Sequence, residues 1–467
     1  MNLERFIAAL GPDEVVNAEG VAGAPVEISD LAYDTRAAGP GALFFCVRGA
    51  HADGHEFASA AAEQGASALV VERPVPVDLP QLVVADVRSA MPQAAVLFFG
   101  NPSAELPIAA VTGTNGKTTT AFLLRSILEA DGRPTGLLTN IERRIGGEGR
   151  PTGLNTPEAI DLQRLLREML DGGDRTAVLE ATSEAAAQGR LAGTRFAVLV
   201  FTNLTQDHLN FHGTMEAYFD AKAALFAQAE RAVVNVGDEW GRRLAASLPD
   251  AITFDARSPA LDGIELPLSG GFNRENAIGA ALAAEALGVD PDGIKRGIES
   301  LKGVPGRFET IDAGQPFAVI VDYAHTPDSL ENVINAARGL GGERLTVVFG
   351  AGGDRDRSKR PLMGRVVCEL ADRAILTSDN PRSEAPDAIA AEVAAGAIGE
   401  IEIELDRRAA ISRALGDAQP GEVVLIAGRG AEPEQELADG KIPFDDREVV
   451  REALATVTAR QIGPGQE

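Results

Sequence analysis

The chain has 467 residues, which is too long for one ordinary hydrophobic core and predicts two to four domains. Its formal charge of −26 argues against a large surface for nucleic acid or anionic lipid, because phosphate binding needs clustered Lys and Arg. Aromatic residues make up only 5% of the chain, so we expect cores built from Ala, Val, Leu and Ile.

The two cysteines, Cys46 and Cys368, lie in short apolar runs and are interpreted as core residues. Two isolated cysteines provide neither a disulfide framework nor a metal site, which is typical of a reducing cytoplasm. The N-terminal stretch "MNLERFIAALGPDEVV" lacks the basic start and long apolar core of a signal peptide. No stretch approaches the roughly 20 apolar residues that cross a bilayer. We therefore expect a cytoplasmic protein without membrane insertion.

The first block of the chain, residues 1–105, contains short strand-like runs separated by helical stretches rich in Ala and Gln. The runs are "GALFFCV", "ASALVVE" and "PQLVVADV". The stretch "GNPSAELP" then combines two prolines with a glycine and predicts a linker.

The second block, residues 106–303, opens with "IAAVTGTNGKTTTAFLLRSILEADG", which reads as a buried strand, a glycine turn and a helix. Further apolar runs follow at intervals, namely "TAVLEAT", "FAVLVFTNL" and "RAVVNVGDE". Helical patterns such as "IDLQRLLREML" lie between them. This alternation predicts a mostly parallel sheet covered by helices.

The third block, residues 304–467, again alternates strands with helices. Its predicted strands are "FAVIVDYA", "RLTVVFGAGG", "RAILTSDNP" and "EVVLIAGRG". Each ends in polar or glycine-rich residues, and open α/β sheets bind ligands beyond the carboxyl ends of their strands. The sequence therefore predicts a three-domain α/β protein whose chemistry lies at these strand ends.

The stretch "GTNGKTT" predicts a phosphate-binding loop between a strand and a helix. Its glycines allow backbone N–H groups to face phosphate oxygens, and the helix N-terminus adds a favourable dipole. Lys117 would reach the β- and γ-phosphates, and the Thr118 hydroxyl would bind Mg²⁺. The usual pattern has glycine where this chain has Val111, and a plain glycine turn is the alternative. The agreement of strand, loop, Lys-Thr pair and helix favours ATP binding by Gly113, Thr114, Asn115, Gly116, Lys117, Thr118 and Thr119.

This loop and several further motifs resemble the Mur ligase family, which includes the folylpolyglutamate synthetases. The motifs, in chain order, are "VTGTNGKTTT", "FTNLTQDHLNFHG", "AYFDAKAALF", "GRFE", "VDYAHTPDSL", "GAGGDRDRSKRPLMG" and "DNPR". The resemblance covers nearly the whole chain and is closest to the diaminopimelate-adding members. It implies a UDP-binding domain (residues 1–105), a central P-loop ATPase domain (106–303) and a C-terminal Rossmann-like domain (304–467).

The resemblance implies an amide-forming reaction in peptidoglycan synthesis, and with it a part in cell shape and division. The D-glutamate carboxylate of UDP-N-acetylmuramoyl-L-alanyl-D-glutamate would attack the γ-phosphate of ATP and give an acyl phosphate. The amine of meso-diaminopimelate would then displace phosphate. Such chemistry depends mainly on positioning and on Mg²⁺ and Lys that neutralise charge. The implied partners are small molecules, and we expect a monomer.

Three residues after the phosphate loop have ordinary interpretations when taken singly: Glu180 as a solvated acid, His208 as a loop histidine and Lys222 as a surface lysine. The resemblance implies instead that Glu180 and His208 bind Mg²⁺ together with Thr118. It matches Lys222 to a carbamoylated lysine (N6-carboxylysine) whose added carboxylate helps to bind the metal. Lys117, His208 and Lys222 are the implied catalytic residues.

The remaining nucleotide contacts rest on the resemblance alone. They are Asn273, Asn276, Arg307, Asp322 and His325. Without the resemblance, the asparagines of "GGFNRENA" would be interpreted as a helix cap.

The resemblance also implies contacts to the UDP-linked substrate. The matching residues are Tyr33, Thr35, Ala50, His51, Ala52, Asn155, Thr156, Thr182, Gln188 and Arg190. Arg190 is the natural partner for a substrate carboxylate, because a guanidinium pairs with it through two hydrogen bonds.

The stretch "DNPR" contains turn formers that would end a strand. In the family it accompanies diaminopimelate, whose second amino-acid head carries a carboxylate. Arg382 can bind that carboxylate, whereas lysine lacks it and would leave a buried guanidinium unpaired. The implied amino-acid contacts are Arg355, Asp379, Asn380, Pro381, Arg382, Gly428 and Glu432.

Three positions depart from the family pattern. Glu184 stands where relatives carry histidine, and in "GRGAE" Arg429 and Ala431 replace a lysine and a histidine. These departures leave two alternatives open: a Mur-type ligase that joins a different amine to a different carboxylate, and a nucleotide-binding regulatory homologue without catalysis.

Overall fold

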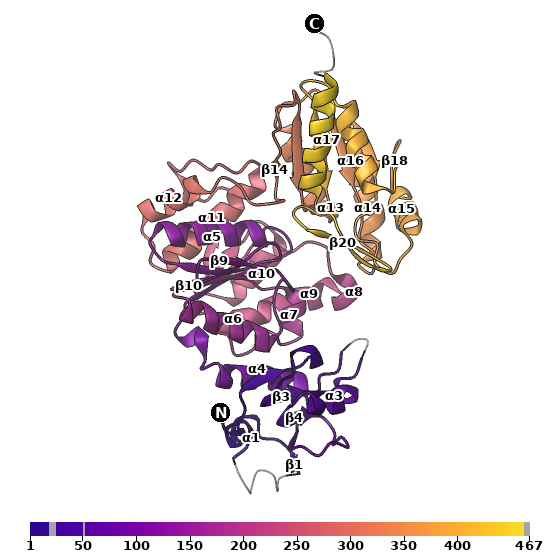
Figure 1. Cartoon of the computed structure of the whole chain (residues 1–467). Helices are drawn as coiled ribbons and strands as arrows, with labels where there is room; N and C mark the ends of the chain where they lie inside the picture. Colours follow the sequence, from indigo (N-terminus) through magenta and orange to yellow (C-terminus); the bar gives the residue numbers. More distant parts are fainter. Residues whose placement is uncertain (18–24, 50–51, 462–467) are drawn as a thin grey trace. The chain divides into compact units, whose positions relative to one another are not determined.

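The computed structural model describes residues 1–17, 25–49 and 52–461 (Figure 1). Its contacts group the chain into two compact units. The first unit comprises Met1–Ala110, Arg133–Leu199 and Ala224–Arg231, and the second comprises Val111–Gly132, Val200–Ala223 and Ala232–Glu467. Among the described residues no helix is long and apolar enough to cross a membrane.

The N-terminal sheet has the strand order β1-β5-β4-β3-β2, in which only β1 runs antiparallel to its neighbour. Every residue of β3 and β4 is buried, as expected for strands covered on both faces. Helices α1 and α4 pack on one face and α3 on the other. The elements are α1 Leu3–Leu10, β1 Glu14–Val16, β2 Asp30–Ala32, β3 Ala42–Phe45, α3 Ala58–Glu63, β4 Ala68–Val71, β5 Gln81–Val83 and α4 Val87–Phe98.

The central sheet has eight strands in the order β13-β12-β11-β6-β10-β7-β8-β9. Its core strand β6 is buried throughout, and β8 and β9 form an antiparallel edge hairpin. The strands are β6 Ile108–Thr112, β7 Thr135–Leu138, β8 Arg143–Ile145, β9 Glu148–Arg150, β10 Thr176–Glu180, β11 Val198–Phe201, β12 Ala232–Asn235 and β13 Ile252–Phe254. The helices are α5 Lys117–Ala130, α6 Ala159–Asp171, α7 Ser183–Ala187, α8 Leu209–His212, α9 Met215–Ala223, α10 Glu239–Ser247, α11 Gly271–Ala286 and α12 Pro291–Ser300.

The C-terminal sheet, orange to yellow in Figure 1, has the order β14-β15-β19-β16-β17-β18 and is parallel except for β14. Helices α13, α14 and α15 pack on one face, and α16 and α17 on the other. The strands are β14 Glu309–Thr310, β15 Ala318–Asp322, β16 Leu345–Phe349, β17 Arg373–Leu376, β18 Glu402–Ile403, β19 Val423–Ala427 and the separate pair β20 Glu434–Leu437 and β21 Gly440–Pro443. The helices are α13 Pro327–Arg338, α14 Arg360–Leu370, α15 Pro386–Ala394, α16 Arg407–Asp417 and α17 Asp446–Gln461.

Short 3₁₀ helices connect several of these elements. They are η1 Thr35–Ala37, η2 Gly54–Phe57, η3 Pro102–Ala104, η4 Ala224–Gln228, η5 Pro259–Leu261 and η6 Arg357–Lys359. The predicted α/β fold with mostly parallel sheets is confirmed.

Local sequence explains how the C-terminal sheet presents a site. Parallel strands β15, β19, β16 and β17 place their carboxyl ends at one edge, where the segments after each strand meet. After β15 the chain enters α13 at Thr326, whose side chain accepts from the Ser329 N–H while the Ser329 hydroxyl accepts from the Thr326 N–H. Pro327 follows in the first helical turn, where its missing N–H costs nothing.

Candidate active site

The phosphate loop connects β6 to α5, and its two glycines have positive φ angles: 147° for Gly113 and 85° for Gly116. A Cβ on Gly113 would lie 1.9 Å from Oγ1 of Thr202, and one on Gly116 would lie 2.2 Å from Oδ1 of Asn276. Only glycine therefore fits both positions. The resulting turn precedes the N-terminus of a 14-residue helix, an arrangement suited to phosphate.

Lys117 lies across this loop. Its Nζ donates to the carbonyl oxygens of Gly113 at 3.0 Å and Thr114 at 2.8 Å. Thr118 and Thr119 are buried in the first turn of α5. The cationic side chain and the helix N-terminus thus lie together, which fits the predicted contacts to the phosphates of ATP.

Three side chains outside the loop hold Asn115. The Thr202 hydroxyl donates to its carbonyl oxygen at 2.6 Å, and its own N–H donates to Oδ1 of Asn203 at 2.9 Å. Its Nδ2 donates to Oδ2 of Asp328 at 2.8 Å. Sequence reasoning missed Thr202, Asn203 and Asp328, although the motifs "FTNLTQ" and "AHTPDS" contain them.

Lys222 reaches the same loop from α9. Its side chain is 1% exposed, and its Nζ donates to the Gly113 carbonyl oxygen at 2.8 Å. It also lies 4.8 Å from the ring centroid of Tyr218, whose hydroxyl is 3.0 Å from the hydroxyl of Thr114. Lys222 is therefore a buried residue of the loop's surroundings, not a surface lysine. Tyr218 is a fourth residue around the loop that the sequence did not indicate.

His208 caps α8 with a φ of 56°, and its neighbour Asp207 is the centre of a charged cluster. Lys359 donates to Oδ1 of Asp207 at 2.9 Å, and Nε2 atoms of His208 and His325 lie 3.6 Å from Oδ2. Burial by itself would raise the pKa of Asp207, but Lys359 and the two imidazoles hold that pKa well below its ordinary value. Asp207 thus brings together His208 and His325, which were both predicted site residues. Asp207 and Lys359 themselves were not predicted.

The predicted Mg²⁺ ligands are distributed between the two compact units. Thr118 accepts a hydrogen bond from Nη2 of Arg307 at 3.1 Å, and Glu180 is the buried last residue of β10. Among the described residues no three His, Cys, Asp or Glu side chains form a group that could hold a metal ion. The predicted set contains only Glu180 and His208 of these types, so the metal site stays a prediction.

Arg307 and Asp322 lie together in the second unit. The guanidinium of Arg307 stacks 4.2 Å from the centroid of the Tyr323 ring. Asp322 accepts from the N–H groups of Phe308 and Ala324, each at 2.7 Å. Burial raises the pKa of Asp322, although Arg307 and these N–H groups oppose the shift. His325 follows, with Nδ1 2.8 Å from the Tyr323 carbonyl oxygen.

Asn273 and Asn276 are buried on α11. The N-cap of that helix is Gly270, so neither asparagine is the cap that unaided interpretation suggested. Asn273 donates to the Ser269 carbonyl oxygen at 2.6 Å, and Asn276 donates to Oδ1 of Asn273 at 3.2 Å. The pair borders the phosphate loop, since Oδ1 of Asn276 occupies the space beside Gly116.

In the first unit, Tyr33 donates to Oδ2 of Asp161 at 2.5 Å. Burial and this carboxylate raise the pKa of Tyr33 above its ordinary value, so the phenol keeps its proton. Thr35 begins η1, and Ala52 accepts from the Gly49 N–H at 2.8 Å. The predicted residues Ala50 and His51 lie outside the described residues.

A second group of predicted substrate contacts lies around Arg190. Its Nη1 donates to the Thr156 carbonyl oxygen at 3.2 Å and its Nη2 to Oε1 of Gln188 at 2.6 Å. The Thr156 hydroxyl lies 3.0 Å from that of Thr182, and Asn155 directly precedes it. Arg190 also forms an ion pair with Glu158 at 3.1 Å, a partner that sequence reasoning missed.

The stretch "DNPR" follows β17 and forms the predicted turn at the carboxyl edge of the sheet. Arg382 has a φ of 52°, donates through Nε to Glu436 and through Nη1 to the Gly353 carbonyl oxygen, each at 2.8 Å, and is 20% exposed. Its Nη2 makes no hydrogen bond to any residue in the described ranges. One donor face of Arg382 is thus available for a ligand.

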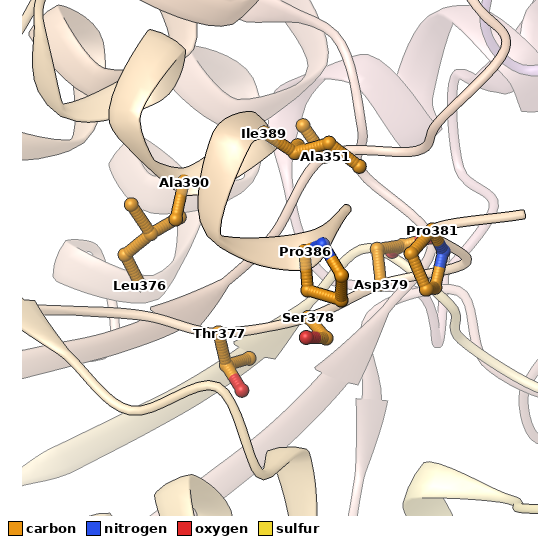
Figure 2. A pocket seen from close by; sticks show the side chains of 9 residues that line it. All are labelled: Ala351, Leu376, Thr377, Ser378, Asp379, Pro381, Pro386, Ile389 and Ala390. Atoms are coloured by element: carbon orange, nitrogen blue, oxygen red, sulfur yellow. The ribbon is translucent and has the colours of Figure 1, made fainter. Parts of the chain in front are cut away.

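Asp379 and Pro381 line a small hollow of about 10 Å³ between the end of β17 and the start of α15 (Figure 2). Asp379 is 7% exposed, and its Oδ2 has no hydrogen-bond partner among the residues that the structure describes. A buried, unpaired carboxylate oxygen is costly without a donor, so this position fits an ammonium group.

The other predicted amino-acid contacts surround the same edge. Asn380 donates to Oε2 of Glu432 at 2.8 Å. Gly428, directly after β19, lies so close to Asp379 that a Cβ on it would be 2.5 Å from Oδ2 of Asp379. Arg355 is exposed on the loop after β16, where its Nη1 donates to the Asp354 carbonyl oxygen at 3.1 Å. The structure therefore brings Asp379, Asn380, Gly428 and Glu432 together.

The three departures from the family pattern have different surroundings. Glu184 lies half-buried in the first turn of α7. Ala431 is buried with its N–H against Gly306, where a Cβ would lie 2.1 Å from the Ala431 nitrogen. Arg429 is completely buried and donates to Oδ1 of Asn380 at 2.7 Å.

Three family models match the chain in order. The Mur ligase family catalytic domain matches residues 27–97, the Mur ligase middle domain matches 111–263, and the Mur ligase glutamate ligase domain matches 306–430. With the phosphate loop and three α/β domains, these matches define the class of protein. The chain belongs to the Mur ligase family, whose members are ATP-dependent ligases.

Particular relatives extend over most of the chain. A protein of Solibacter usitatus named UDP-N-acetylmuramoyl-L-alanyl-D-glutamate–2,6-diaminopimelate ligase is 43% identical and spans 92% of this chain and 94% of its own length. A protein of Geobacillus kaustophilus with the same name is also 43% identical, spanning 92% and 95%. A solved structure of a ligase of that name superposes with a TM-score of 0.62 at 33% identity, covering 93% of this chain and 95% of that one.

Proposed function

We propose that the chain joins meso-2,6-diaminopimelate to the D-glutamate carboxylate of UDP-N-acetylmuramoyl-L-alanyl-D-glutamate, with ATP, in peptidoglycan synthesis. The names of the 43%-identical relatives support this substrate pair. The observation that carries the choice of amino acid is Arg382, which directly follows Pro381 of the hollow and whose Nη2 makes no hydrogen bond to any described residue. That guanidinium suits the distal carboxylate of diaminopimelate, and Oδ2 of Asp379 suits an ammonium group.

The reaction proceeds in two steps. A carboxylate oxygen of the substrate attacks the γ-phosphorus and ADP leaves, which gives an acyl phosphate. The amine nitrogen then attacks the activated carbonyl, and phosphate leaves as the amide forms. N–H groups of the loop and Lys117 hold the phosphates, and Arg307 lies against Thr118 where it adds positive charge. The protein's contribution is therefore positioning and electrostatics.

Mg²⁺ would be held by the Thr118 hydroxyl, Glu180, His208 and the carboxylate of carbamoylated Lys222. Oxygen-rich sets of one or two carboxylates with substrate phosphates are those that Mg²⁺ prefers. Thr118 and Lys222 both border the phosphate loop, which supports the assignment. When bound, Mg²⁺ supplies charge neutralisation between the two anionic substrates.

The chain would act in the cytoplasm as a monomer, and its three substrates are small molecules. A second candidate function follows from Glu184 and Ala431, which replace family histidines near the substrate sites. It is a Mur-type ligase that uses a different amine or a different acceptor.

A phosphate-release assay with purified chain, ATP and the UDP-linked dipeptide separates these functions. Diaminopimelate, lysine or no amino acid is offered in parallel. We expect release with diaminopimelate only, together with a product heavier by the mass of diaminopimelate less water. Release with lysine alone supports the second candidate, whereas no release under any condition supports a nucleotide-binding homologue without catalysis.

A further inference from the structure

Arg429 stands where the family pattern has lysine, and it is a completely buried cation beside the amino-acid site. Its side chain is 0% exposed and makes three hydrogen bonds. Nη1 donates to Oδ1 of Asn380 at 2.7 Å, and Nη2 donates to the carbonyl oxygens of Glu434 at 2.8 Å and Phe444 at 3.0 Å. Arg429 thereby ties the turn after β17 to the open end of the β20–β21 hairpin, where Glu434 begins β20 and Phe444 follows β21.

The contact to Asn380 determines which way that amide faces. Oδ1 of Asn380 accepts from Arg429 and also from the Glu436 N–H at 2.9 Å. Because both neighbours are donors, the NH₂ group must face the other way. There Nδ2 donates to Oε2 of Glu432 at 2.8 Å. Arg429 and the Glu436 N–H thus fix the orientation of Asn380 together, and Arg429 makes the shorter of the two contacts.

Glu432 is in turn held from two sides. Oε2 accepts from Asn380, and Oε1 accepts from the Tyr323 hydroxyl at 3.2 Å. The negative charge of Glu432 and burial raise the pKa of Tyr323, so the phenol keeps the proton that it donates. The carboxylate therefore has one defined orientation at the carboxyl edge of the sheet.

We propose that Arg429 is a positioning residue for the incoming amino acid, acting through Asn380 to orient the Glu432 carboxylate toward the substrate's ammonium group. This inference rests on the proposed function, in which Asn380 and Glu432 contact the amino acid. Arg429 itself touches no substrate. Among the proposed amino-acid contacts, Asn380 is the one whose side chain Arg429 holds directly.

The positions of the three oxygen atoms that accept hydrogen bonds from residue 429 require an arginine there. They lie on three segments, and the planar guanidinium reaches them with two separate nitrogens. A lysine offers one nitrogen on a flexible stem, so it satisfies only part of the set. The guanidinium also lies 4.0 Å from the buried carboxylate of Asp446 and 5.4 Å from the Phe444 ring centroid, which supports the charge in the interior.

The test compares Arg429→Met and Arg429→Lys with a matched control, Arg373→Met. Arg373 lies at the opposite end of β17, where it pairs with Glu402 and Asp417. Steady-state kinetics are measured separately for ATP and for the amino acid that the wild-type chain uses. We expect the KM for the amino acid to rise roughly tenfold or more in Arg429→Met, with the KM for ATP within twofold, because a buried acceptor loses its donor. Arg429→Lys should recover part of the loss, and Arg373→Met should leave both KM values unchanged.

Equal rises in both KM values, or a fall in kcat alone, would overturn the inference and leave Arg429 a purely structural residue. A crystal structure of Arg429→Met adds a readout that needs no activity: the contact between Asn380 and Glu432 should be lost or loosened, and an unchanged contact contradicts the inference. The wild-type chain tests the proposed function separately. If the wild-type chain uses an amino acid other than diaminopimelate, the proposed function fails. The ratio of the KM of Arg429→Met to that of the wild type, measured with that other amino acid, still tests the role of Arg429.

Discussion

The ammonium group of Lys222 donates to the carbonyl oxygen of Gly113, with 2.8 Å between the two atoms. Lys117 donates to the same oxygen at 3.0 Å. Two cations therefore converge on one backbone atom of the phosphate loop, although they lie on different helices. This convergence places positive charge where an anionic nucleotide would bind, and it gives Lys222 a position from which a modification would act on the loop.

We expect Lys222 to carry a carbamate in the active enzyme. A carbamate nitrogen keeps one N–H, so the hydrogen bond to Gly113 persists while a carboxylate is added for Mg²⁺. With ¹³C-labelled bicarbonate, the wild-type chain should show a carbamate carbon signal by NMR that Lys222→Arg lacks. Lys222→Arg should also lose at least about 100-fold in kcat, since a guanidinium cannot act as a metal ligand. A labelled signal that survives in Lys222→Arg would place the modification elsewhere.

Gly116→Ala should weaken both ATP binding and stability. Its Cβ would lie 2.2 Å from Oδ1 of Asn276 at a φ of 85°. We expect a free energy of unfolding lower by about 1–3 kcal/mol and a Kd for ATP at least about tenfold higher. The control is Gly132→Ala, which has a φ of 78° but no atom within 4 Å of the added Cβ. It should cost about 1 kcal/mol of backbone strain and leave calorimetric ATP binding unchanged.

Arg382→Ala should impair the use of diaminopimelate and spare ATP. Removal of a guanidinium that pairs with a carboxylate should raise the KM for diaminopimelate by roughly 10- to 100-fold. The KM for ATP should change by less than about twofold, because the hydrogen-bond partners of Arg382, namely Glu436, Gly353 and Asn380, are not predicted ATP contacts. Arg408→Ala removes an exposed arginine of the same domain that pairs with Glu452, and it serves as the control. Unchanged diaminopimelate kinetics in Arg382→Ala would refute the role of Arg382.

Glu384 should make stability dependent on pH in the acid range. Its hydrogen bonds to the buried Arg360 lower the pKa of Glu384 from its ordinary value of 4.5 to about 2, although burial opposes the shift. A lowered pKa contributes stability that is complete above pH 4.5 and is lost as the pH falls toward 2. Urea unfolding should therefore show Glu384→Gln less stable by about 1–3 kcal/mol near neutral pH, with the difference shrinking below pH 4.5. A difference independent of pH would contradict this assignment, and the exposed Glu400→Gln should match the wild type throughout.

Local patterns were sufficient for much of the fold. Apolar runs such as "IAAVT" and "VVLIA" became the buried strands β6 and β19, because consecutive residues determine whether a strand has one or two covered faces. The phosphate loop could also be predicted from the sequence, since its glycines, Lys117 and the start of α5 are neighbours in the chain. The turn formers of "DNPR" ended a strand as expected.

The sequence by itself determined these local features and the family, because both depend on residue types at short spacings. Only the tertiary structure decided which distant side chains meet: Lys222 at Gly113, Lys359 at Asp207 and Arg429 at Asn380. It also showed that Asn273 and Asn276 are buried beside the loop and do not cap a helix. The physical reason is that burial and charge pairing depend on how separate strands and helices pack. Packing thus places Lys222 of α9 at the phosphate loop. It also places Arg429, which departs from the family motif, where it holds the side chain of Asn380.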